Sequence, residues 1–132
     1  MVGAFFGSIH GTLNHIVYGD LAFLSRFTGD PAAPPKLGAE LYADFADLKR
    51  MREELDERIA AWATSLSTEW LSEKLTYASN VDGVMRTVPR WTLVVHMLNH
   101  QTHHRGQITT LLCQLGFDIG TTDIPFMPEF QT

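Results

Sequence analysis

The sequence predicts an all-α fold, built from three long helices with a small hairpin before the last of them. Hydrophobic residues recur at helical spacing in three long segments, and glycine and proline turn signals separate these segments. A turn signal between two short extended runs at residues 75–90 predicts the hairpin. Residues 1–132 are expected to form a single domain, because this length is enough to bury one hydrophobic core.

The first predicted helix runs from about residue 7 to residue 28. Its hydrophobic residues follow helical spacing: Ile9, Leu13, Ile16, Val17, Leu24 and Phe27. The segment Thr28-Gly29-Asp30-Pro31, followed by Pro34-Pro35, predicts the end of this helix and a loop.

The second predicted helix covers LYADFADLKRMREELDERIAAWATSL, residues 41–66. Its hydrophobic residues also follow near-helical spacing: Leu41, Phe45, Leu48, Leu55, Ile59 and Trp62. The charged run KRMREELDER within it is typical of a solvated outer face. After it, Ser67 is expected to cap a short helical turn that contains Trp70.

The last predicted helix runs from about residue 89 to residue 115. Asn80-Val81-Asp82-Gly83 predicts the turn of the preceding hairpin, Pro89 suits the first helical turn, and Gly116 is the expected stop. The tail, FDIGTTDIPFMPEF, is apolar and rich in proline, and we expect it to pack as irregular chain.

Composition excludes several classes of function. The net charge is −5 and no cluster of lysine and arginine is present, which disfavours nucleic-acid binding. No apolar run is long enough to span a bilayer, and no segment is typical of a secretory leader, so we expect no membrane partner. The single cysteine, Cys113, allows no internal disulfide; it suggests a cytoplasmic protein, and we expect its thiol to be buried and inert.

Histidines are concentrated in the last helix, where HMLNHQTHHRGQ holds four of the chain's six. His100 and His104 lie about 40° apart on one helical face, so both can reach one metal ion. A metal site needs a third ligand from another element, and the first helix offers His10 and His15. His15 shares its face with small residues that would let a neighbouring helix approach closely: Ser8, Gly11, Thr12, Gly19 and Ala22.

Three of the histidines are better interpreted as structural residues than as ligands. A buried histidine is more often a core hydrogen-bond donor than a metal ligand, and this role, or exposure to solvent, is favoured for His10, His96 and His103. The last helix also has a second apolar face, which would suit contact with another subunit: Val94, Val95, Leu98, Leu112 and Cys113.

Two blocks of sequence resemble the DinB-like (damage-inducible) family of metal-dependent proteins. They are FFGSIHGTLNHIVYGD with the following LxxLSRFTGD, and HMLNHQTHHRGQITTLLCQLG. The resemblance implies an antiparallel up-and-down four-helix bundle, commonly dimeric. It also implies a divalent metal, zinc or nickel, held by His15, His100 and His104. Family members are similar to the bacillithiol- and mycothiol-dependent transferases and isomerases.

The chain departs from the family pattern at its beginning. Family members usually carry another helix before the first block, whereas this sequence starts a few residues before it. We therefore expect three long helices, with either an earlier start of the gene or a partner subunit covering the exposed flank. The apolar residues that would otherwise face water are Phe5, Phe6, Ile9 and Leu13. On this ground a homodimer is expected.

The hypothesis for function is a thiol S-transferase or hydrolase-type enzyme. In it, the metal binds a low-molecular-weight thiol cofactor and lowers the pKa of that thiol. The resulting thiolate reacts with a small-molecule substrate. Residues that would support the ligands from outside are Asn99, His103 and Gln107, with Asp20 paired to Arg105. No catalytic acid or base can be named from the sequence. The alternative is a non-catalytic, metal-binding stress-response dimer, and a DNA-binding role is opposed by the acidic charge balance.

Overall fold

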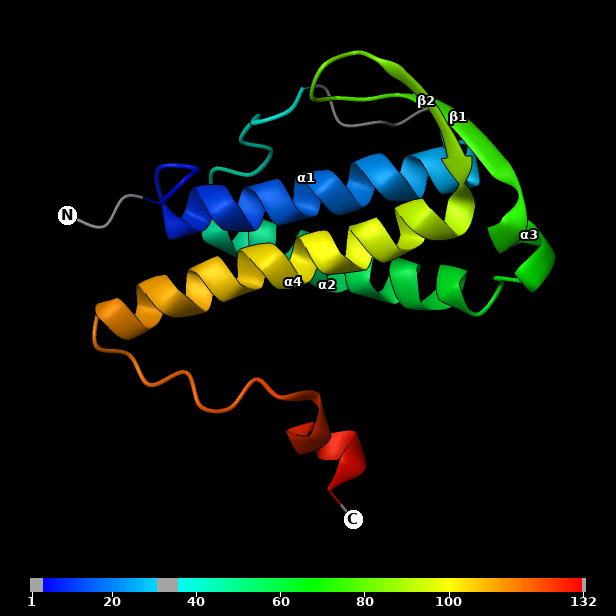
Figure 1. Ribbon diagram of the computed structural model, residues 1–132. Helices are drawn as coiled ribbons and strands as arrows, with labels where there is room; N and C mark the ends of the chain where they lie inside the picture. Colours follow the sequence, from blue (N-terminus) through cyan, green and yellow to red (C-terminus); the bar gives the residue numbers. More distant parts are fainter. Residues whose placement is uncertain (1–3, 31–35, 132) are drawn as a thin grey trace.

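The computed structural model describes residues 4–30 and 36–131, so the predicted loop prolines Pro31, Pro34 and Pro35 lie outside the described residues (Figure 1). Within that part, the chain is mostly helical with one small hairpin, as predicted. The elements in order are α1 (Ile9–Thr28), α2 (Phe45–Ala63), α3 (Thr68–Ser72), β1 (Lys74–Ala78), β2 (Met85–Pro89) and α4 (Arg90–Gln114), followed by two short 3-10 turns, Ile124–Phe126 and Pro128–Phe130.

The helices begin and end at residues with the expected capping chemistry. Ser8 accepts a hydrogen bond from the amide of Gly11 at the start of α1, and Ser67 does the same for Trp70 in α3. Gly29 ends α1 with a φ of 71° and Gly116 follows α4 with a φ of 87°, a left-handed conformation that favours glycine. The predicted stops of α1 and α4 are therefore confirmed.

The connectivity differs from the up-and-down prediction, because α1 and α2 run parallel. Tyr42, just before α2, contacts Asn14 near the start of α1, and Trp62 near the end of α2 stacks on Phe27 near the end of α1 at 5.2 Å between ring centroids. Residues 36–44 lead back to the start of α1 before α2 begins, so α1 and α2 are joined by a crossover and not by a tight turn (Figure 1). Only α4 runs antiparallel to α1 among the three long helices.

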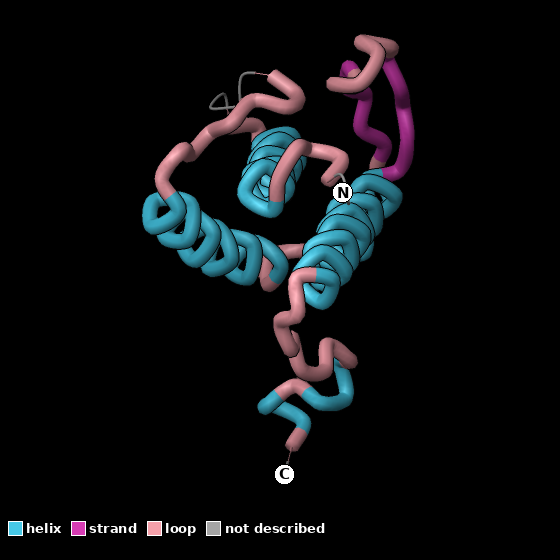
Figure 2. The backbone as a smooth tube through the Cα atoms, turned by 90° about the vertical axis from the view of Figure 1, so that its left-hand side faces the viewer, coloured by secondary structure: helices cyan, strands magenta, loops and turns pink. Residues whose placement is uncertain are grey.

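Helix α1 lies between the other two long helices, and the core forms on its two sides (Figure 2). One cluster joins α1 to α2 and contains Val17, Leu24, Leu48 and Leu55. The other joins α1 to α4 and contains Phe27, Leu93 and Met97, with the hairpin residues Leu75, Tyr77 and Val88 packed against it. On the remaining side a groove of about 400 Å³ lies between α2 and α4 over Leu13, Ile16 and Val17.

The hairpin is confirmed where it was predicted. Strands β1 and β2 pair antiparallel, with Leu75 opposite Val88 and Tyr77 opposite Arg86. Gly83 has a φ of 70° in the turn and donates its amide to the carbonyl of Ser79. The hairpin leads directly into α4, so its position fixes where that helix starts.

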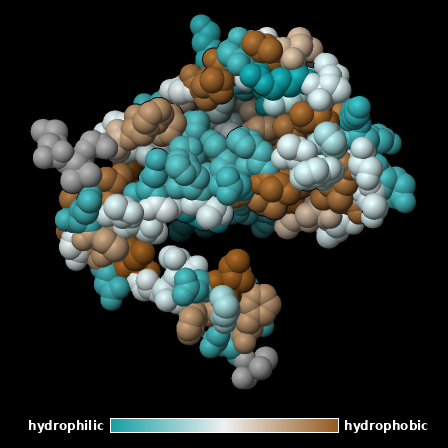
Figure 3. Space-filling model, viewed as in Figure 1, coloured by the Kyte–Doolittle hydropathy of each residue, from teal (hydrophilic) through white to brown (hydrophobic). Residues whose placement is uncertain are grey.

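The tail after α4 is exposed, which contradicts the expectation that it packs. Phe117, Ile124, Phe126 and Phe130 are each 60% exposed or more. Figures 1 and 3 show this segment leaving the helices, with hydrophobic side chains on its surface. The chain turns away from the helices at Gly116, so the tail does not pack against them.

The outer face of α4 is also uncovered. Trp91, Val95 and Leu98 are each at least 50% exposed, and Cys113 is exposed, so the prediction of a buried thiol was wrong. This face points away from α1, and no described helix packs against it. At the N-terminal flank Phe5 is 84% exposed, whereas Phe6, Ile9 and Leu13 are partly buried.

No described helix is both long and apolar enough to span a bilayer.

A buried asparagine holds the crossover segment against α1. Asn14 is 1% exposed, and its Oδ1 accepts hydrogen bonds from the amides of Leu41 (3.0 Å) and Tyr42 (2.9 Å). Its Nδ2 donates to the carbonyls of Tyr42 and His10. The hydrophobic spacing had predicted that residues 41–44 belong to the second helix. The hydrogen bonds to Asn14 explain why these residues lie outside α2 and precede it.

Replacing Asn14 should therefore destabilise the fold. We expect Asn14→Ala to lower the free energy of unfolding by roughly 2–4 kcal/mol, because two backbone amides lose their acceptor. Urea denaturation followed by circular dichroism measures the change. The matched control is Asn99→Ala on the exposed face of α4, for which we expect a change below about 0.5 kcal/mol. Equal effects of the two substitutions would contradict this role for Asn14.

Candidate metal centre

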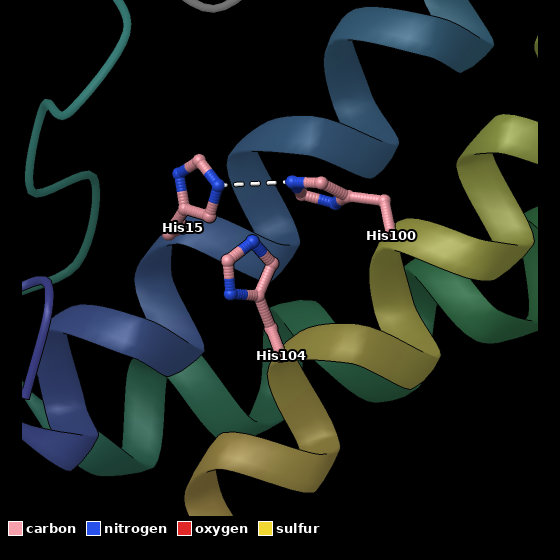
Figure 4. A group of neighbouring side chains, drawn as sticks. All are labelled: His15, His100 and His104. Atoms are coloured by element: carbon pink, nitrogen blue, oxygen red, sulfur yellow. Dashed lines mark hydrogen bonds between the residues drawn. The ribbon is translucent and has the colours of Figure 1, made fainter.

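Three histidines from two helices converge at the interface of α1 and α4. His15 comes from α1, and His100 and His104 come from successive turns of α4 (Figure 4). One ring nitrogen of each lies within 4.8 Å of the others, and the Nε2 atoms of His15 and His100 are 2.9 Å apart. Nitrogens that share one tetrahedral zinc ion are roughly 3.3 Å apart, given Zn–N bonds of about 2.05 Å. The group could therefore hold a metal ion with small ring movements.

A glycine allows the two helices to approach this closely. A Cβ atom placed on Gly19 would lie 2.8 Å from Cε1 and 3.0 Å from Nδ1 of His100. Real Cβ contacts are almost never that short, so only glycine leaves room for the His100 ring at its present position. The expected close approach over a face of small residues is thus found at Gly19.

A buried polar contact next to this glycine sets the register of α1 against α4. Asp20 is fully buried, and its carboxylate accepts hydrogen bonds from Gln101 Nε2 (2.8 Å) and Arg52 Nη1 (2.5 Å). Burial raises the pKa of Asp20, while the bonds from Gln101 and Arg52 act in the opposite direction. The predicted pairing of Asp20 with Arg105 was wrong: Arg105 is exposed, and it contacts Gln101 and Thr102 instead.

Burial keeps two of the three imidazoles neutral. Burial, with a smaller contribution from the neighbouring His104, lowers the pKa of His15 to about 4 and that of His100 to about 4. Both rings therefore carry a free electron pair at neutral pH. Neutral imidazole is the form that binds a divalent metal.

The ring nitrogens also lack partners that a folded protein normally supplies. Among the described residues, the buried Nδ1 atoms of His15 and His100 have no hydrogen-bond partner. The two Nε2 atoms face each other, so at least one of them must carry a proton to avoid lone-pair repulsion. A buried cluster of nitrogens with unmet electron pairs costs free energy. A divalent cation would satisfy one nitrogen on each ring, so the donor set fits such an ion.

Gln107 and Phe6 contact the ligands from outside. Gln107 Oε1 lies 2.7 Å from Nδ1 of His104, a contact that leaves the other ring nitrogen of His104 for a metal. The Phe6 ring stacks on His15 at 3.9 Å between centroids and meets His104 edge-on at 5.5 Å. The sequence analysis predicted a supporting role for Gln107. It gave Phe6 only as an apolar residue that would face water or a partner subunit.

The other predicted residues lie at the edge of the group or away from it. His103 is exposed, 3.3 Å from Gln107 Nε2, and Asn99 is exposed and does not line the cavity next to the histidines. His10 makes the core hydrogen bond that was favoured for it, with Nε2 at 2.8 Å from the carbonyl of Tyr42. His96 is exposed and packs edge-on against Phe23.

A cavity of about 630 Å³ opens at the three histidines, between α1 and α4 and beneath the hairpin. Figure 3 shows the surface hollowed below the hairpin. Several residues of its wall were missed by sequence reasoning: Tyr18, Phe23, Arg26, Tyr77, Asn80 and Val88. Those on α1 continue the stripe that starts at His15, so helical spacing from that histidine could have found them.

The chain is similar to known proteins over most of its length. The model of the DinB family matches residues 2–132. Protein DinB of Bacillus subtilis (strain 168) is 30% identical over 124 residues, which cover 89% of this chain and 70% of that protein. The uncharacterized protein YrdA of the same organism is 26% identical over 108 residues, 82% of this chain and 64% of YrdA. No solved structure gave a significant match.

The family match covers nearly the whole sequence, and the structure places His15, His100 and His104, to which the family resemblance points, in one group. The chain therefore belongs to the DinB family.

Proposed function

We propose that this chain binds a divalent metal, zinc or nickel, through His15, His100 and His104 and acts as a thiol S-transferase or hydrolase-type enzyme. The observation that carries the proposal is the cavity that opens directly at the three imidazoles. Three protein ligands beside an open space are typical of catalytic metal sites, whereas structural sites are closed by a fourth protein ligand. Imidazole suits both zinc and nickel, and a low-molecular-weight thiol is the expected cofactor.

Each residue of the site has a physical task in this proposal. The bound metal would supply Lewis acidity that stabilises a thiolate near neutral pH. The neutral rings of His15 and His100 would donate electron pairs, and Gln107 would hold the ring of His104 in one orientation. Phe6 would shield the histidines from water by covering His15. The apolar cavity wall would bind the substrate and exclude solvent from the reacting group.

The alternative is a metal-binding stress-response protein without turnover. None of the described residues that line the cavity is acidic, so it offers no carboxylate as a general base. A thiolate that attacks directly needs no such base, and for this reason the transferase is preferred. The net charge of −5 remains unfavourable for DNA binding.

A homodimer in the cytoplasm completes the proposal. A dimer interface would bury the exposed apolar residues of α4, which are Trp91, Val95 and Leu98. Light scattering at micromolar concentration should give twice the chain mass of 14.8 kDa. A mass of one chain would contradict the dimer and leave the metal site unaffected.

The proposed ligands are tested by metal content. His100→Ala should weaken zinc binding by more than about 100-fold, beyond the effect expected for an outer-shell partner, because a ligand itself is removed. Elemental analysis after dialysis against a weak chelator measures retained zinc and nickel. The matched control is His96→Ala, one turn earlier on α4 and outside the ligand group, which should retain the full metal content. Equal retention by both variants, or a metal-free wild type that takes up no ion, would contradict the proposal.

The close approach at Gly19 gives a second test. Gly19→Ala should weaken zinc binding by roughly 10–100-fold, because the new methyl group displaces the His100 ring from its position. The matched control is Gly106→Ala on α4, where a Cβ meets nothing within 4 Å. That control should bind zinc normally and stabilise the helix by up to about 1 kcal/mol. Competition with a colorimetric zinc chelator measures both affinities, and unchanged binding by Gly19→Ala would show that the ring position is not critical.

A further inference from the structure

The cavity extends well beyond the histidines, and its far end carries a cation. Along α1 the lining residues follow one stripe from His15 through Tyr18, Ala22 and Phe23 to Arg26. Arg26 lies eleven positions after His15 on the helix, or about 16 Å along its axis at 1.5 Å per residue. The hairpin residues Tyr77 and Asn80 form the wall around this far end.

No carboxylate of the described residues pairs with the Arg26 guanidinium. Its hydrogen bonds go to neutral acceptors, the carbonyl of Ala78 (3.3 Å) and Oδ1 of Asn80 (2.8 Å), and both use Nη2. It also lies 5.2 Å from the ring centroids of Phe23 and of Tyr77. Among the described residues it forms no ion pair, although six other arginine and lysine side chains do: Lys49, Arg50, Arg52, Arg58, Arg86 and Arg90.

The charges around the cavity favour an anion at that end. The chain as a whole carries a net charge of −5, yet none of the described lining residues is aspartate or glutamate. Between Arg26 and the histidines the wall is largely apolar, with Ala22, Phe23, Val88 and Leu93. A partly buried guanidinium with Nη1 and Nε not engaged by any described residue can still donate a charge-assisted hydrogen bond to a carboxylate.

We propose that the cavity selects elongated molecules with an apolar middle and a terminal carboxylate, which Arg26 binds while the other end reaches the three histidines. This inference rests on the proposed metal site for the head group and on Arg26 for the tail group. It assigns Arg26 a role in specificity, in addition to holding the hairpin through Ala78 and Asn80.

The test compares two probes that differ in one terminal group. Mercaptoundecanoate and mercaptoundecanol share a thiol head and an apolar chain, and only the first ends in a carboxylate. Isothermal titration of the purified, zinc-loaded full chain should show the acid binding roughly tenfold tighter than the alcohol, as one charge-assisted hydrogen bond would give. Mercaptopropionate also carries a carboxylate, but its short chain cannot span the cavity, so it should not show the tighter binding of the long acid.

Variants assign the preference to Arg26. Arg26→Gln should bind both long probes equally, and Arg26→Lys should keep part of the preference because it keeps the charge. The matched control, Arg58→Gln, removes the same charge from α2 outside the cavity and should behave as the wild type. A purely structural role for Arg26 would weaken both probes together and leave their ratio unchanged.

The outcomes separate this inference from the proposed function. Equal binding of acid and alcohol to the wild type would overturn the role of Arg26, even if zinc content and thiol binding are normal. If the wild type holds no metal, undecanoate and undecanol, which lack the thiol, replace the long probes. A preference for undecanoate that disappears in Arg26→Gln would support the role of Arg26, and its absence would overturn it.

Discussion

The contact between α1 and α4 at Gly19 is the constraint on which the site depends. With no side chain at that position, the His100 ring lies against the α1 backbone and within 2.9 Å of His15. The neighbouring residues, Asp20 and Gln101, join the same two helices through a buried hydrogen bond. A shift of α4 by one residue would break that bond and turn His100 and His104 away from His15, because successive helical positions differ by about 100°. The polar contact and the absent side chain thus act together to bring three imidazoles to one place.

Electrostatics explain why such an arrangement suits a metal and an anionic ligand in an acidic protein. Many charged residues lie on the outer face of α2, where they form ion pairs with one another, such as Arg50 with Asp47. The cavity, by contrast, is lined by histidines, aromatic rings and one guanidinium, without a carboxylate from the described residues. Burial lowers the pKa of His15 and His100 and so holds the rings in their neutral form. A bound cation would then face no carboxylate among the described residues that line the cavity, and it would attract an anion.

Much of the site could be predicted from local sequence, whereas its surroundings could not. The spacing of His100 and His104 places both on one helical face, and the small residues around His15 indicated a close helix contact. The direction of α2 could not be predicted, because it depends on the buried Asn14 binding the amides of Leu41 and Tyr42 across a long crossover. Phe6 lies before α1 in irregular chain, so no periodicity indicates that it covers His15. Asp20 pairs with Arg52 of α2 and not with Arg105. The sequence pattern does not give the position of α2 against α1, so this pair could not be predicted. The exposure of Cys113 and of the tail likewise depends on which faces lack a neighbour in a single chain.

The central claim is that three imidazoles bind one ion and leave a position open toward the cavity. X-ray absorption spectroscopy of the zinc-loaded protein, with and without an added thiol, tests it most directly. The account predicts three imidazole nitrogens at about 2.0–2.1 Å with one or two light exchangeable atoms, and a sulfur at about 2.3 Å once thiol is added. Four protein ligands in the thiol-free sample, with no sulfur after thiol is added, would contradict it.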